Sequence, residues 1–316
     1  MERNTNGKQN ERTGMSVRLL GEPTKEKASG VAFSLSALLP TALAFLFLIV
    51  ITAFGLTQTA GYEQSSWYLY VSYLLPQISF ALVALWFLSY TKTPLSGVLR
   101  KQKCYPKYFV VALLLQIGLF SLSELNGLFL EFLGKFGYQD DGILLPSMDG
   151  FGFVGVFIVV ALFPAVFEEI MFRGILLNGL RSFKSIGAML VCGALFSLYH
   201  QNPAQTLYQF CCGVAFALVA LRAGSILPTV LAHFLNNAVI LILTKLGITT
   251  FSTPVFIAII AVSAVCLVLS LGYLIFLDKK EENIEKTGSK KQFFACAGVG
   301  IAVCALSWLL VLFTGF

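Results

Sequence analysis

Charged side chains are scarce in this chain of 316 residues. Asp, Glu, Lys and Arg together make up 12% of it, whereas a soluble globular domain carries roughly 25%. Hydrophobic residues make up 57%, and the mean hydropathy is +0.81. A surface that faces water cannot be covered with so few charges. The composition therefore excludes an ordinary soluble domain and indicates that lipid surrounds much of the chain.

Patterns typical of several other protein classes are also missing. None of the seven cysteines forms a CxxC pair and six lie in apolar runs, which favours small buried hydrophobic side chains over a disulfide framework or a zinc cage. The net charge of +6 is confined to short segments and forms no basic stripe interleaved with aromatics, so no nucleic acid is expected as a partner. The sequence contains no internal repeat.

Nine apolar segments approach the roughly 20 residues that a membrane-spanning helix needs. They predict an all-α polytopic transmembrane helix bundle of about nine spans, with eight as the alternative count. The fifth segment is short, and Asn202-Pro203 directly after it marks a tight turn. The segments are 31–56, 66–90, 108–133, 151–177, 186–200, 204–221, 225–246, 253–277 and 293–314.

Around these spans the sequence predicts four regions. Residues 1–30 form a polar cytoplasmic tail, residues 31–277 the membrane core, residues 278–292 a basic cytoplasmic loop, and residues 293–316 a C-terminal span. Basic and non-basic connections alternate along the chain: six Lys and Arg residues precede the first span, none separates the first from the second, and 134–150 is mostly acidic. Because Lys and Arg favour the cytoplasmic side, the N-terminus is predicted in the cytoplasm and the C-terminus outside.

A few polar side chains interrupt the spans, and such groups are costly at membrane depth and usually mark function. Within the fourth span, Glu169 and Arg173 are four residues apart and can form an ion pair on one face. Glu168 lies about 100° around the helix and needs another partner. His200 ends the fifth span. In the seventh span, His233 and Asn237 are four residues apart and lie on one face of the helix.

Helical rise places these groups in one layer of the membrane. Counted from the predicted cytoplasmic ends at about 1.5 Å per residue, Glu168 lies roughly 14 Å deep and His200 roughly 21 Å. His233 and Asn237 lie roughly 12 Å and 18 Å deep by the same count. Three spans therefore deliver a carboxylate, two imidazoles and an amide to one polar cavity, nearer the cytoplasmic face.

Two kinds of chemistry fit such a cavity. A carboxylate beside an imidazole can activate water as a general base, while a second imidazole and a carboxamide donate hydrogen bonds to an oxyanion. Alternatively, Glu168, His200 and His233 form a ligand set for a divalent metal such as zinc, with an open position for water. The HExxH signature of soluble zinc proteases is absent.

Three motifs occur in order: Glu168-Glu169-x-x-x-Arg173, Phe196-x-x-x-His200 and His233-x-x-x-Asn237. They resemble the motifs of the CPBP family, which comprises the CAAX-type prenyl endopeptidases and the related bacteriocin-processing and immunity proteins of the Abi group. The resemblance covers about residues 151–246. It implies cleavage of a peptide bond within the membrane, either glutamate-dependent or as a metalloprotease.

The resemblance also assigns roles to the motif residues. Glu168 and His200 would activate water, His233 and Asn237 would form the oxyanion hole, and Glu169 with Arg173 would support the site. The resemblance implies no cofactor in the glutamate-dependent form, and asparagine as the last motif residue favours that form over a zinc site. It implies a peptide or protein substrate, with a C-terminal or prenylated segment as one option, and an integral multi-pass location in membrane lipid.

Other interpretations of these residues stay open. Glu169 and Arg173 could be an ion pair at a helix end, His200 a helix cap, and the third motif a set of polar contacts between helices. For the whole chain, the alternatives are a proton- or ion-coupled transporter, and a non-catalytic scaffold or immunity protein on the same fold. Neither the substrate nor the oligomeric state follows from the sequence.

Overall fold

The computed structural model describes residues 25–100, 104–140, 142–180, 182–278 and 289–314. Regular structure within these ranges is helical and includes no strand, which confirms the all-α prediction. Eight helical stretches there are long and apolar enough to cross a membrane. The fifth predicted segment is a shorter apolar helix of 15 residues, α9 (Ser185–Tyr199).

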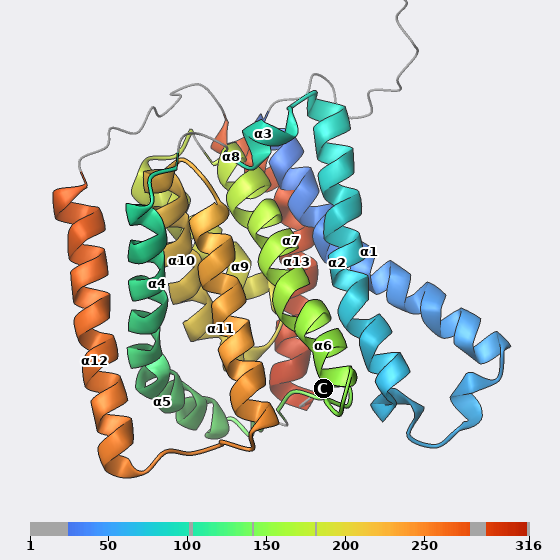
Figure 1. The fold of residues 1–316 in the computed structure, drawn as a ribbon. Helices are drawn as coiled ribbons and strands as arrows, with labels where there is room; N and C mark the ends of the chain where they lie inside the picture. The colour runs from blue at the N-terminus through green and yellow to red at the C-terminus, as the bar shows by residue number, and fades with distance from the viewer. Residues whose placement is uncertain (1–24, 101–103, 141, 181, 279–288, 315–316) are drawn as a thin grey trace, which may run out of the picture.

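The helices alternate in direction along the bundle (Figure 1), and the end at which α1 begins is called the upper end. In chain order the elements are α1 (Lys25–Ala53), η1 (Leu56–Gln58), η2 (Tyr62–Gln64), α2 (Ser66–Thr91), α3 (Leu95–Val98), α4 (Lys107–Leu119), η3 (Phe120–Leu122), α5 (Ser123–Gly134), α6 (Gly152–Val156), η4 (Phe157–Leu162), α7 (Phe163–Glu169), η5 (Ile170–Leu176), α8 (Leu177–Gly179), α9, η6 (Pro203–Gln205), α10 (Thr206–Ala223), α11 (Leu227–Lys245), α12 (Thr253–Gly272), η7 (Tyr273–Leu277) and α13 (Lys290–Thr314).

Helix α1 begins at Lys25, so residues 25–30 of the predicted polar tail are helical. The reason is tertiary packing: Ala28 and Ser29 are fully buried, and the Ser29 hydroxyl donates to the carbonyl of Ile175 at 2.9 Å. The rest of the predicted tail, and residues 279–288 of the predicted basic loop, lie outside the described ranges.

The two largest of the four hydrophobic clusters among the described residues form most of the core of the bundle. The first joins α1, α2, α3, η5, α8, α9, α10 and α13, and contains Phe172 and Phe196. The second joins α4, α10, α11 and η7, and contains Phe216. Helices α9 and α10 cross closely because glycines face each other: a Cβ atom on Gly213 would lie 2.6 Å from the Cα of Gly193. This crossing fixes the position of the residues that end α9.

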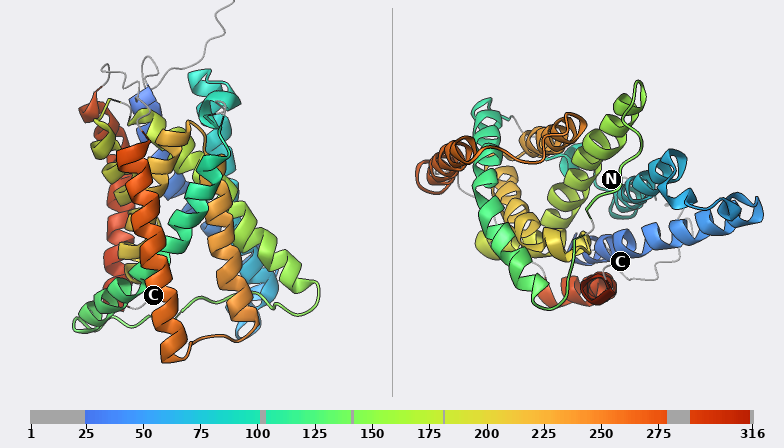
Figure 2. Two further views of the ribbon diagram at one scale, coloured as in Figure 1. Left: turned by 60° about the vertical axis from the view of Figure 1, so that its left-hand side comes forward. Right: turned by 90° about the horizontal axis from the view of Figure 1, so that it is seen from below.

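The turn between α9 and α10 is covered by protein. Helix α5 crosses the lower end of this helix pair (Figure 2), and Asn126 of α5 donates to the carbonyl of Ala204 at 3.2 Å. The Tyr138 hydroxyl lies 3.2 Å from Oδ1 of Asn202, which also accepts from the backbone N–H of Ala204 at 2.8 Å. Irregular backbone at membrane depth is tolerated where protein satisfies its polar groups, as it does at this turn.

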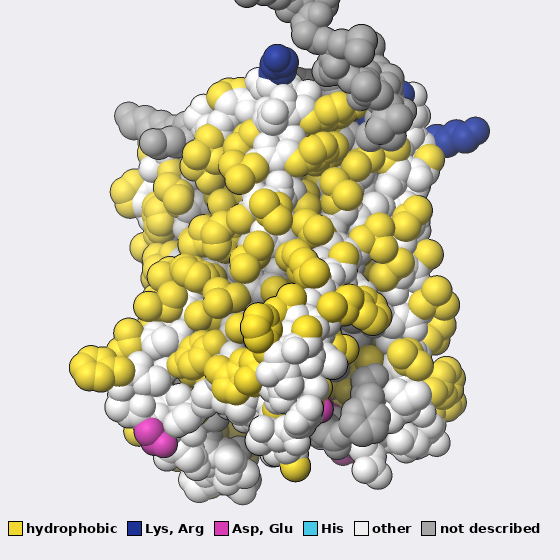
Figure 3. Space-filling view, turned by 90° about the vertical axis from the view of Figure 1, so that its right-hand side faces the viewer, with side chains coloured by type: hydrophobic (Ala, Val, Ile, Leu, Met, Phe, Trp, Pro, Cys, Tyr) yellow, Lys and Arg dark blue, Asp and Glu magenta, His cyan; other side chains and the backbone are white. Residues whose placement is uncertain are grey.

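Surface charge separates toward the two ends of the bundle. On the face shown in Figure 3, Lys and Arg side chains lie at the upper end and Asp and Glu side chains at the lower end, with hydrophobic side chains between them. The apolar band and the eight long helices identify an integral multi-pass membrane protein.

Candidate active site

The fourth span departs twice from α-helical geometry. The π-helical segments η4 and η5 flank the short helix α7, which ends at Glu168 and Glu169. Single π-helical turns inside α-helices are frequent at functional sites. Pro164 lies in the first turn of α7. Because proline has no N–H, the carbonyl of Val160, four residues earlier, loses its α-helical donor.

Glu169 connects the first motif to the third. Its Oε1 accepts a hydrogen bond from Nη1 of Arg173 at 2.8 Å and lies 3.0 Å from Nδ1 of His233. Glu169 and Arg173 are fully buried, and His233 is 8% exposed. A carboxylate oxygen accepts, so Nδ1 of His233 carries the proton of this bond. The predicted ion pair is therefore present, and it also holds the imidazole of another span.

Aromatic rings enclose the Arg173 guanidinium on two sides. Its central carbon lies 4.3 Å from the ring centre of Phe196 and 5.3 Å from that of Phe216. A cation over an aromatic face is attracted by the ring quadrupole. Phe196 is the first residue of the second motif, and its ring centre lies 4.7 Å from that of His200 and 6.3 Å from that of His233. Phe196 thus brings all three motifs into contact.

Glu168 faces the site from the same helical turn as Glu169. It is 9% exposed, and its buried Oε2 has no hydrogen-bond partner among the described residues. The nearest charged-group contact of this oxygen is Nε2 of His233, at 3.9 Å. Because the carboxylate is buried and not bound to a neighbour, it is available to an external group such as water.

His200 directly follows α9, and its Nδ1 lies 2.8 Å from the carbonyl oxygen of Phe196. A carbonyl oxygen only accepts, so Nδ1 carries the proton, and Nε2 of the neutral ring keeps a lone pair. Among the ion-pair contacts of the described residues, Glu168 contacts His233 and not His200. The predicted partnership of Glu168 and His200 would therefore act through a molecule between them.

Asn237 and His233 line a common cavity of about 20 Å³ between α4, α9, α10 and α11. This volume suits roughly one water molecule. Nδ2 of Asn237 donates to the carbonyl of Val160 at 3.4 Å, and its Oδ1 accepts from Nδ2 of Asn236 at 3.1 Å. Neither Glu168 nor His200 lines this cavity. Its walls are Gln116, Phe196, Gln209, Cys212, Phe216, His233, Asn236 and Asn237.

The described residues do not form a ready-made site for the predicted metal set. Zinc would require donor atoms of Glu168, His200 and His233 within about 2.0–2.3 Å of one point. In the part of the chain that the structure describes, no three His, Cys, Asp or Glu side chains are grouped to hold a metal ion. The Nδ1 atoms of both histidines are engaged in hydrogen bonds, which leaves their Nε2 atoms as the ring nitrogens open to another ligand. No step of the chemistry below is therefore assigned to a metal.

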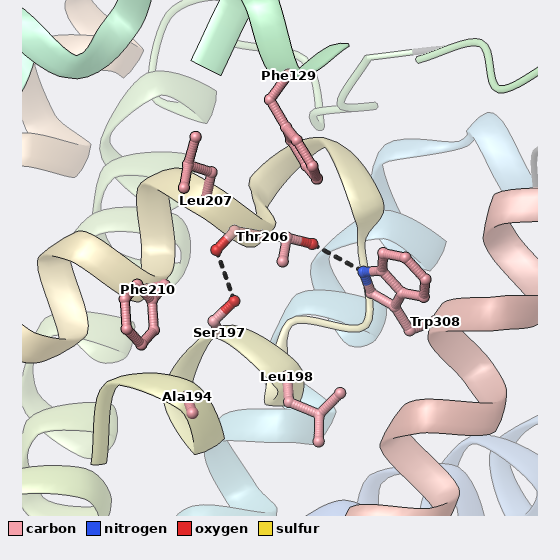
Figure 4. A pocket seen from close by; sticks show the side chains of 8 residues that line it. All are labelled: Phe129, Ala194, Ser197, Leu198, Thr206, Leu207, Phe210 and Trp308. Carbon is pink, nitrogen blue, oxygen red and sulfur yellow. Dashed lines mark hydrogen bonds between the residues drawn. The ribbon is translucent and has the colours of Figure 1, made fainter. Parts of the chain in front are cut away.

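A second and larger cavity of about 420 Å³ lies beside the second motif, with walls from α5, α9, α10 and α13 (Figure 4). The few polar groups there bond to one another: Ser197 donates to the carbonyl of Thr206 at 2.7 Å, and Nε1 of Trp308 donates to the Thr206 hydroxyl at 2.7 Å. The exposed walls are consequently apolar. Ser197 lies three residues before His200, so this cavity shares a helical turn with the site.

Buried carboxylates and imidazoles within a polytopic helical bundle define the class: a membrane protein with a buried polar site. Residues 150–239, which hold all three motifs, match the family model described as type II CAAX prenyl endopeptidase, Rce1-like. This match confirms the resemblance to CPBP family intramembrane proteases that the motifs predict. No curated protein and no solved structure matched the chain.

Proposed function

We propose that this protein is an intramembrane endopeptidase that hydrolyses a peptide bond with water activated by Glu168 and His200. The observation that carries the proposal is the buried contact of Glu169 with both Arg173 and His233, beside the unpartnered Oε2 of Glu168. The family match supports it, because the matched proteins are described as prenyl endopeptidases.

The proposed first step is attack by water on the scissile carbonyl carbon. Glu168 Oε2 accepts one water hydrogen, and Nε2 of His200 accepts another hydrogen bond through its free lone pair. As the C–O bond forms, one water proton moves to the pair of Glu168 and His200, and the carbonyl oxygen becomes an oxyanion. When the C–N bond breaks, the same proton passes to the leaving amine, so the protein ends in its starting state.

His233 and Asn237 would stabilise the oxyanion. Since Nδ1 of His233 already donates to Glu169, Nε2 can donate as well only when the ring is an imidazolium. Oε2 of Glu168, at 3.9 Å from Nε2, and Oε1 of Glu169, at 3.0 Å from Nδ1, are the acidic atoms that such an imidazolium would face. Asn237 contributes the second N–H of its amide, since the first points to Val160.

The substrate would be a peptide or protein segment with a hydrophobic part, such as a prenylated C-terminus. The apolar cavity beside His200 supports this proposal, because 420 Å³ lies within the roughly 300–1,000 Å³ of small-molecule sites. Its walls offer van der Waals contact and no unpaired donor, which suits a hydrocarbon chain.

The test compares the peptides in membranes of cells that produce either the wild-type protein or a Glu168→Gln variant. The proposal expects fragments that are present only with the wild-type protein, because glutamine is isosteric but cannot take up the proton. Identical peptide sets would contradict the proposal. If the variant also complements a deletion phenotype, the non-catalytic scaffold becomes the better account.

A further inference from the structure

A chain of amide side chains leads from α4 to the third motif. Nε2 of Gln116 donates to Oδ1 of Asn236 at 2.6 Å, and Nδ2 of Asn236 donates to Oδ1 of Asn237 at 3.1 Å. Nδ2 of Asn237 in turn donates to the carbonyl of Val160 at 3.4 Å. Gln116 belongs to α4, outside the matched residues 150–239, and no motif includes it.

The direction of every bond in this chain is fixed from one end. The Val160 oxygen can only accept, so the nitrogen of the Asn237 amide must face it. The Asn237 oxygen then faces Asn236, which must present its nitrogen. The Asn236 oxygen is left for Gln116, which therefore donates. Pro164 supplies no α-helical donor to the Val160 carbonyl, which accepts from Asn237.

We propose that Gln116 and Asn236 are positioning residues that hold the Asn237 carboxamide with its nitrogen toward the reacting carbonyl. This inference rests on the proposed function. An amide that could flip would present its oxygen to the oxyanion for part of the time, and that contact is repulsive. The tyrosine Tyr208 adds a second donor to Asn236 at 3.4 Å, which further fixes the Asn236 orientation.

The setting of Gln116 supports a role beyond packing. Its side chain is 4% exposed, and its buried Oε1 has no hydrogen-bond partner among the described residues. The same side chain lines the small cavity next to His233 and Asn237, whose volume suits one water molecule. A buried amide in an apolar span is costly unless it has a hydrogen-bonding role. For Gln116, that role is the hydrogen bond to Asn236.

The test measures peptide cleavage by the full-length protein for Gln116→Leu, Asn237→Ala and the double variant. Gln116→Leu should lower kcat about tenfold, the factor that corresponds to losing one hydrogen bond, and leave KM unchanged. On the Asn237→Ala background the same change should have no further effect on kcat, because no amide remains to be oriented. A purely structural role would lower kcat by the same factor on both backgrounds.

Two further variants keep the test decisive. Gln116→Met preserves the length of the side chain and replaces Gln116→Leu if the latter does not fold. Asn178→Leu is the matched control, because Asn178 is a buried amide, 5% exposed, in α8 away from the third motif. Unchanged kcat in Gln116→Leu, or equal losses on both backgrounds, would overturn the proposal. Loss of Glu168 dependence would instead contradict the proposed function itself.

Discussion

Arg173 neutralises a carboxylate that has no access to water. It and Glu169 are both fully buried, and their 2.8 Å contact also holds His233 through the shared Oε1. Removing one partner of such a pair leaves an uncompensated buried charge, which costs about 3–5 kcal/mol. The same change would release the His233 imidazole, so stability and activity are coupled at this residue.

The Arg173→Met variant should therefore unfold at a markedly lower temperature than the wild-type protein. Adding Glu169→Gln should recover part of the loss, because no buried charge is then left unpaired. Thermal unfolding of the two single variants and the double variant in detergent measures this coupling. A double variant whose loss equals the sum of both single losses would argue against the ion pair.

Sequence spacing was informative about residues that share one helix. The four-residue separation predicts the Glu169–Arg173 pair, and the structure contains it. Spacing could not show that His233 bonds to Glu169, since this contact depends on how two spans pack. Gln116 is the one amide in an otherwise apolar stretch of α4, and this isolation could have indicated a functional residue. Its partner on α11 follows only from three-dimensional packing.

Helix α9 is too short to match its neighbours, and this shortness shapes the site. Its 15 residues end at a turn that α5 covers, which leaves His200 and the apolar cavity inside the bundle beside that turn. Ala194 of α9 lines that cavity and is exposed within it. A larger side chain at this position would fill the space without touching the buried ion pair.

An Ala194→Phe variant should discriminate between substrates. Losing contact with about two methylene groups costs about 1.6 kcal/mol, so kcat/KM for a prenylated peptide should fall about tenfold. The rate for the same peptide without the prenyl group should stay unchanged. The control is Ala261→Phe, which makes the same change on an exposed position of α12. Equal losses for both peptides would exclude the cavity as the hydrophobic subsite.

The hydropathy of the sequence predicts where the helices lie but not where they are interrupted. Each predicted apolar segment corresponds to a helical stretch of the structure. The break at η3 and the π-helical segments on both sides of α7 were not predicted. A hydropathy window measures composition, whereas these features depend on which carbonyl each N–H reaches. Pro164 is the clearest local sign, because it removes one donor from the fourth span.

At the scale of the whole molecule, the distribution of charged side chains distinguishes the two ends of the bundle. We propose that the upper end faces the cytoplasm, since Lys and Arg favour that side and lie at that end in Figure 3. In a chain with its native cysteines replaced, a membrane-impermeant thiol reagent applied to intact cells should label an Asp140→Cys variant. It should leave a Lys92→Cys variant unlabelled, and the opposite pattern would reverse the orientation.

The central claim is that the Glu168 carboxylate activates the attacking water. The most direct measurement is the cleavage rate of a peptide substrate by the purified protein in lipid vesicles. General-base catalysis contributes about 10²–10⁴-fold, so Glu168→Gln should slow cleavage at least about a hundredfold. The control Glu124→Gln, at an exposed position of α5, should cleave at the wild-type rate. A Glu168→Gln variant that cleaves within a few-fold of wild type would contradict the account.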